Sequence, residues 1–172
     1  MRRSARIILI LIPLLLFLSS AYGGEFRVTR VYDGDTVKAE TPEIVLYIGL
    51  VGIDAPEVCV GKGRQGQPFG EAAKKYLESL VLNKTVVVEG YGTLPYPDKN
   101  LISVIYLDGM NVNLEMVKHG MAEVQKEDLP KGFDIHPYLE AEQEARRVKN
   151  GMWVLKEKYQ SPKEWRKKQG GK

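Results

Sequence analysis

The sequence predicts a small α+β domain: a closed five-stranded OB-fold β-barrel with one inserted helix and further helices at its C-terminal end. Five segments between residues 26 and 109 have the alternating or β-branched composition of strands, and one helical segment interrupts them after the third. Beyond residue 109 the apolar residues recur at helical spacing instead. The 172 residues suffice for one domain with a full hydrophobic core.

Residues 1–23 have the order of a secretory signal peptide. Three arginines in the first six residues precede an apolar run at 7–18, and small residues follow. The run is short for a membrane span, although an uncleaved membrane anchor is the alternative. We therefore expect cleavage between Ser20 and Glu25 and a secreted or periplasmic mature protein.

The strands follow in order from residue 26. Residues 26–32 alternate, Asp-Gly-Asp forms a turn, and residues 36–40 resume as the second strand. The third strand covers residues 43–53, and residues 84–90 and 101–109 supply the last two. A glycine-rich loop and a helix at 71–82 separate the third strand from the fourth. The apolar stripe of that helix consists of Ala73, Tyr76, Leu77, Leu80 and Val81.

The C-terminal part of the chain is predicted to be helical. A short helix begins with Asn113 as its N-cap and ends before Gly120. A longer helix opens at Pro137 and closes at Asn150-Gly151. Its inner side is expected to carry Ala141, Ala145 and Val148.

Charge is unevenly distributed along the chain. After residue 23 there are 22 basic and 22 acidic residues, but residues 145–172 contain 10 basic and 2 acidic ones. We expect a domain at 24–153 and then a basic tail, 154–172, with a short helix that starts at a capping box at Ser161. The tail either guides a polyanion toward the acidic body or is a solvated terminal helix. In the first case the phosphate contacts would come from Lys163, Arg166, Lys167 and Lys168.

Four carboxylates stand at strand ends, where they can gather: Asp33, Asp35, Asp54 and Glu57. Pro56 stiffens the backbone between the last two, which holds Glu57 near Asp54. Two aspartates and a backbone carbonyl make an oxygen-only site of the kind that calcium prefers, and a third carboxylate can hold and deprotonate a water. Ordinary turn chemistry is the alternative for each motif taken alone.

Several motifs, in order and spacing, resemble the staphylococcal nuclease-like (thermonuclease) family. They are VYDGDTV, GIDAPE, QPFGEAA, VIYLDGMNVNLEMVKHGMAEV and EAEQEARRVKNGMW, and the resemblance runs from about Phe26 to Trp153. The resemblance implies the barrel already predicted and calcium-dependent hydrolysis of DNA and RNA phosphodiesters. It also implies that Asp35, Asp54 and the carbonyl of Ala55 bind the metal, and that Glu57 activates the attacking water.

The chain departs from the family pattern at both arginines that clamp the phosphate. Five residues before Asp54 the family has arginine, and this chain has Gly49. Six residues before Tyr106, at the second arginine position, stands Asn100. Losing one preorganised donor to a transition-state charge costs on the order of 10²–10³ in rate. The candidate replacements are Lys99 beside Asn100, and Lys62 or Arg64 in the glycine-rich loop.

These residues predict a monomeric, exported, calcium-dependent nuclease that is weakened by the missing arginines. The alternative is an inactive nuclease-like barrel that binds nucleic acid or a protein partner. Gln125 replaces a tyrosine that is frequent in this subgroup and would stack on a base. His119 is expected to be structural, at a helix C-terminus. Cys59, the single cysteine, is either a small hydrophobe or a reactive thiol.

Overall fold

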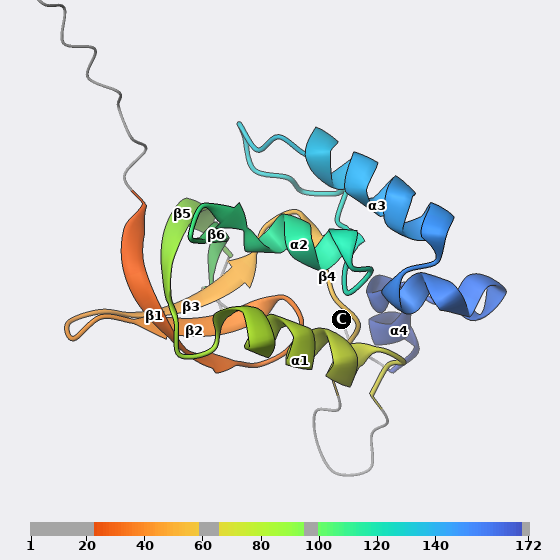
Figure 1. Ribbon diagram of the computed structural model, residues 1–172, viewed down its shortest axis with the longest axis horizontal. Helices are drawn as coiled ribbons and strands as arrows, with labels where there is room; N and C mark the ends of the chain where they lie inside the picture. Colours follow the sequence, from red (N-terminus) through yellow and green to blue (C-terminus); the bar gives the residue numbers. More distant parts are fainter. Residues whose placement is uncertain (1–22, 59–65, 95–99, 170–172) are drawn as a thin grey trace, which may run out of the picture.

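A computed structural model describes residues 23–58, 66–94 and 100–169. The main part of the structure is the predicted barrel, which lies on the left in Figure 1. The sheet order is β3-β2-β1-β5-β6, and a parallel pairing of β3 with β6 closes it. The five strands are β1 (Gly24–Val31), β2 (Thr36–Glu40), β3 (Val45–Leu50), β5 (Thr85–Thr93) and β6 (Leu101–Leu107).

Alternating side chains of the five strands fill the barrel, because successive residues of a strand point to opposite faces. Those that are buried include Val28, Val37, Ile48, Val86 and Ile105. Helix α1 (Gly70–Val81) packs on β1 and α2 through the predicted stripe, of which Ala73, Leu77 and Val81 are fully buried. The α+β barrel with one inserted helix is thereby confirmed.

The third strand is shorter than predicted. It breaks at Gly52, which has a φ of +79°, and the chain resumes as β4 (Ile53–Asp54). A phenyl ring, that of Phe133, occupies the place of a side chain at position 52. Strand β4 pairs with β8 (Glu123–Val124), while β7 (Met110–Asn111) extends β6 as a small hairpin.

The helices of the C-terminal part cover one end of the barrel (Figure 1). Helix α2 (Val112–Lys118) packs on β6, and α3 (His136–Val148) packs on α2. A 3-10 helix, η1 (Gly151–Lys158), leads to α4 (Pro162–Lys168). Within the described ranges no helix is both long and apolar enough to cross a membrane.

One prediction about the helices was wrong, and a second was right only in part. The N-cap of α2 is Asn111, whose Oδ1 accepts the N–H of Leu114 at 2.9 Å, because the helix begins earlier than its apolar pattern indicates. Asn113 is instead fully buried inside the fold. On α3, Ala145 is buried and Ala141 packs partly buried against the core, as predicted, but Val148 is 52% exposed at the helix end, and the other buried residues are Tyr138 and Glu142.

Buried Asn113 connects three separate segments. Its Oδ1 accepts the N–H of Ile105 at 3.2 Å, and its Nδ2 donates to the carbonyls of Val51 and Ser103 at 3.0 Å each. The side chain therefore fixes the bend between β3 and β4, just before Asp54.

Candidate active site

The first carboxylate of the site is held by the turn between β1 and β2. Asp33 Oδ1 accepts the N–H of Asp35 at 3.1 Å, which shapes the turn. A Cβ at Gly34 would lie 2.6 Å from that of Ala55 and 2.8 Å from that of Ala73, so only glycine permits this packing. The close approach places Asp35 beside Ala55, whose N–H donates to Asp35 Oδ2 at 2.7 Å.

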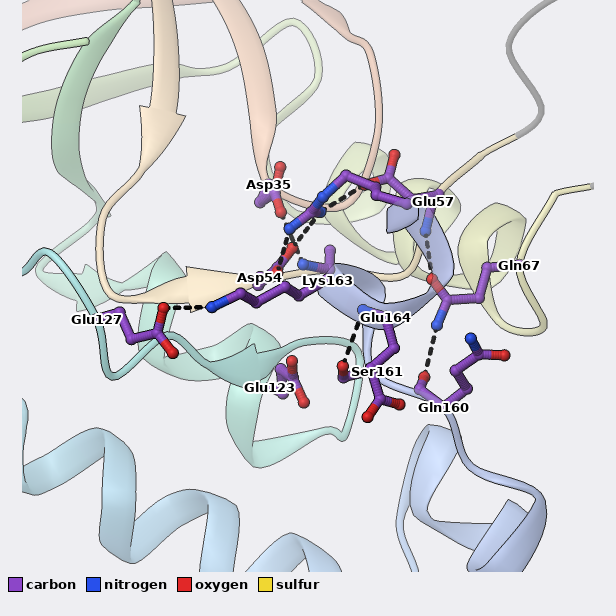
Figure 2. A network of polar contacts seen from close by, with 12 residues as sticks. Asp35, Asp54, Glu57, Gln67, Glu123, Glu127, Gln160, Ser161, Lys163 and Glu164 are labelled. Carbon is purple, nitrogen blue, oxygen red and sulfur yellow. Dashed lines mark hydrogen bonds and ion pairs between the residues drawn. The ribbon is translucent and has the colours of Figure 1, made fainter. Parts of the chain in front are cut away.

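The other two carboxylates come from β4 and the residues after it. Asp54 is paired with Glu123 across the β4–β8 ladder. The backbone of Glu57 is held on both sides by Gln67: Glu57 N–H donates to Gln67 Oε1 at 3.1 Å, and Gln67 N–H donates to the Glu57 carbonyl at 2.9 Å. A side chain at Gly70 would meet that carbonyl at 2.2 Å, so the start of α1 also positions Glu57. Figure 2 shows Asp35, Asp54 and Glu57 gathered in one place.

The electrostatics at Asp35 favour a bound cation. Burial raises the pKa of its carboxyl, the nearby carboxylates of Asp33 and Asp54 raise it further, and the hydrogen bond from Ala55 opposes them. Asp54 and Glu57 are less enclosed, with side chains 14% and 29% exposed. Enclosed carboxylate oxygens of this kind fit a hard divalent cation.

The donor set for a metal is therefore two carboxylates, those of Asp35 and Asp54, together with the adjoining Ala55 carbonyl. No group of three or more His, Cys, Asp or Glu side chains in the described part of the chain is placed to hold an ion. A divalent cation held by these donors would need water or substrate oxygens to complete its shell.

An arginine from the C-terminal helix reaches these carboxylates. Arg166, on α4, donates from Nη1 to Glu57 Oε1 at 2.6 Å and to Asp54 Oδ1 at 2.9 Å. Its Nη2 donates to Asp54 Oδ2 at 2.7 Å. The bond to Asp54, followed by that to Glu57, raises the pKa of the guanidinium against the opposing effect of burial, so it is always charged.

A cavity of about 520 Å³ opens at this point of the barrel. Asp35, Asp54 and Arg166 line it, together with Gly49 and Asn100, the two positions where the family pattern has arginine. A second cavity, of about 500 Å³, shares Asp54 and Arg166 and extends toward Lys126, Arg146 and Lys167. Gln125 lines both cavities.

The structure thus brings Asp35, Asp54, Ala55 and Glu57 together, as the sequence predicts. Lys62, Arg64, Lys99 and Cys59 lie outside the described residues, so their predicted roles remain predictions. His119 is structural in its contacts: Nδ1 lies 3.0 Å from the Glu115 carbonyl and the ring packs on Tyr76.

Sequence reasoning did not find Gln67, or the place of Arg166 in the site. Gln67 is a buried amide in what looked like loop sequence. Arg166 was expected to be one of several tail cations, and nothing local indicated contact with a residue 112 positions away.

Comparisons with known proteins agree with this architecture. A family model described as "Staphylococcal nuclease homologue" matches residues 47–155. An "Uncharacterized endonuclease" of Escherichia coli O157:H7 is 37% identical over 150 residues, covering 83% of this chain and 88% of that protein. One of the same name from Haemophilus influenzae is 33% identical, covering 83% and 73%. A "Probable endonuclease LCL3" of Pyricularia oryzae is 31% identical, covering 69% and 48%.

The fold and the acidic site identify the chain as a β-barrel domain of the nuclease type. The chain belongs to the staphylococcal nuclease homologue family.

Proposed function

We propose that this protein is an exported, calcium-dependent endonuclease that hydrolyses phosphodiester bonds of DNA or RNA. Membership of a nuclease family, and relatives named as endonucleases, support a metal-dependent hydrolase acting on nucleic acid. The observation that carries the proposal is that the β1–β2 turn brings Asp35 to Asp54 and Glu57, which come from β4 and the residues after it, beside an open cavity.

Each side chain has a defined task in this proposal. The Asp35 and Asp54 carboxylates and the Ala55 carbonyl hold calcium, which neutralises charge on the phosphate when bound. The Glu57 carboxylate orients a water and accepts its proton as the water oxygen attacks phosphorus. The bond from phosphorus to the leaving oxygen then breaks, and that oxygen takes up a proton from solvent.

A cleavage assay with a matched binding measurement tests this function. The full chain, without its first 22 residues, is incubated with plasmid DNA and with RNA, in calcium or in chelator. We expect cleavage only with calcium, and a rise in melting temperature of the folded protein with calcium, because a ligand that binds only the folded state stabilises it. Asp35→Asn should abolish both effects.

The missing arginines favour a second candidate, a barrel that binds nucleic acid without cleaving it. In that case DNA and RNA would remain intact with every divalent cation tried, while an oligonucleotide would still bind. Cleavage that persists in chelator would contradict both candidates.

A further inference from the structure

We infer that Arg166 is the phosphate-binding arginine of this enzyme, and that α4 supplies the guanidinium that Gly49 and Asn100 cannot. The inference deepens the proposed nuclease function and rests on it. It assigns a substrate-binding role to one residue of the C-terminal helix.

The guanidinium of Arg166 lies next to the position that a bound phosphate would have to occupy. One nitrogen, Nη1, touches both Glu57 and Asp54, so the cation lies between the proposed base and a proposed metal ligand. A phosphate attacked by a water on Glu57 must lie within reach of that nitrogen. Guanidinium matches phosphate oxygens with paired N–H groups, which makes arginine the residue suited to this task.

Arg166 also has further hydrogen-bonding capacity and access to solvent. A guanidinium carries five N–H donors. The three bonds that it makes in the described part of the chain occupy three of them. The side chain is 43% exposed and lines both cavities, so a phosphate in either one can approach the remaining donors.

The β3 side of the same cavity is open at position 49. A Cβ built on Gly49 meets no atom within 4 Å, so there is space where the family pattern places an arginine. Asn100 lines the same cavity and carries no charge. In this cavity the guanidinium enters from α4 instead of from β3 or the segment before β6.

Helix α4 is held in place by contacts of the residues just before it and of Lys163 within it. Gln67, which also holds the Glu57 backbone, donates from Nε2 to the Gln160 carbonyl at 2.7 Å. Tyr159 donates to Glu123, and Lys163 pairs with Glu127. Figure 2 shows this series of contacts from Glu57 through Gln67 to Gln160. Arg166 is therefore directed to the site by the docked tail.

A role of Arg166 in stability alone does not explain why its guanidinium lies at the carboxylates and lines both cavities. A partly exposed ion pair contributes little to stability, so stabilisation alone does not require an arginine at this place. Autoinhibition, in which Arg166 only blocks the carboxylates, makes the opposite prediction for activity, so one set of variants distinguishes the two roles.

The test uses the full chain without its first 22 residues, as Arg166→Ala, Arg166→Lys and the unmodified protein. Arg147→Ala is the matched control, since Arg147 makes a similar paired contact with Glu144 at the surface, away from the site. Cleavage of a single-stranded oligonucleotide is measured in calcium. Binding of the same oligonucleotide is measured in chelator over a range of salt concentrations.

We expect Arg166→Ala to lower the cleavage rate by about 10²–10³-fold. Binding in chelator should weaken, and the slope of log affinity against log salt should fall by about 0.7, the value for one contact with single-stranded nucleic acid. Arg166→Lys should retain the salt slope but recover only part of the rate. Adding Gly49→Arg to Arg166→Ala should restore at least about tenfold in rate, because it returns a guanidinium to the same cavity.

Unchanged or faster cleavage by Arg166→Ala would overturn the inference, the faster rate indicating autoinhibition. An unchanged salt slope would overturn it as well. Circular dichroism and a retained calcium-induced rise in melting temperature show that the variant is folded. If the unmodified protein cleaves nothing, the proposed function fails, and the salt slope in chelator still tests the phosphate contact of Arg166.

Discussion

Asp35 is expected to destabilise the fold when it is charged and to bind the metal in the proposed function. Its carboxylate is enclosed beside those of Asp33 and Asp54. Among the described residues, the Ala55 N–H and the Thr36 hydroxyl donate to it. Holding a charge in such surroundings destabilises the fold, whereas binding a divalent cation would reverse the effect.

We therefore expect Asp35→Asn to raise the melting temperature of the protein in chelator at pH 7, because the amide keeps an oxygen for the Ala55 N–H and removes the repelled charge. In calcium the order should reverse, as the unmodified protein gains stability from the ion and the variant does not. Asp108→Asn, at an exposed turn, is the control and should change neither value. A lower melting temperature of Asp35→Asn in chelator would contradict this account.

Asn113 supports the site indirectly, because it holds the bend of the backbone just before Asp54. We expect Asn113→Ala to lower the free energy of unfolding by about 1–3 kcal/mol, since it leaves buried groups of Ile105, Val51 and Ser103 without their partner. Urea denaturation measures the change. Gln143→Ala, on the exposed face of α3, should alter stability by less than about 0.5 kcal/mol, and an equal effect of both substitutions would refute the role of Asn113.

Helix α4 carries Arg166 to the carboxylates of the site, and the residues that hold α4 in place therefore determine this contact. The predicted N-cap is present, with Ser161 Oγ accepting the N–H of Glu164 at 3.2 Å, but the described residues show no return bond from the Glu164 carboxylate to the Ser161 N–H. The position of α4 against the barrel could not be predicted from the sequence. It depends on contacts of Gln67 and Glu123, which are far from α4 in the sequence, with the residues just before the helix. A local pattern specifies that a helix forms, and long-range contacts specify where it lies.

We expect a chain that ends after Gln160 to remain folded, because Pro162 alone among the described residues of α4 is buried. Its affinity for an oligonucleotide should fall, and the salt slope should decrease by about 0.7 for each phosphate that α4 binds in the full chain. Far-ultraviolet circular dichroism and a salt titration of binding measure the two properties. Unchanged affinity and slope would favour a helix without a role in binding.

For the whole molecule, the barrel was predictable because its strands have β-branched, alternating sequences and its core is filled by those residues. The short strands β4 and β8 were not predictable, since two residues carry no periodicity. The same limit applies to the site. Asp35, Asp54 and Glu57 follow from motifs, whereas the Arg166 contact joins residues more than 100 positions apart.

The proposed export concerns the chain as a whole. Strand β1 begins at Gly24 and pairs with β5 from its first residue, so a chain cleaved before Gly24 keeps every strand that the structure describes. We expect the mature N-terminus to lie between Ser20 and Glu25. Intact-mass spectrometry of protein expressed with its own leader measures this, and mature protein that begins at Met1 or Arg2 would contradict it.

The most direct test of the proposed active site is the single-turnover cleavage rate of Glu57→Gln at saturating calcium, compared with the unmodified protein. The account predicts a rate about 10²–10⁴-fold lower, the usual loss when a general base is removed, with calcium affinity by calorimetry nearly unchanged. Cleavage by Glu57→Gln at the rate of the unmodified protein would contradict the assignment of Glu57 as the base, and with it the proposed site.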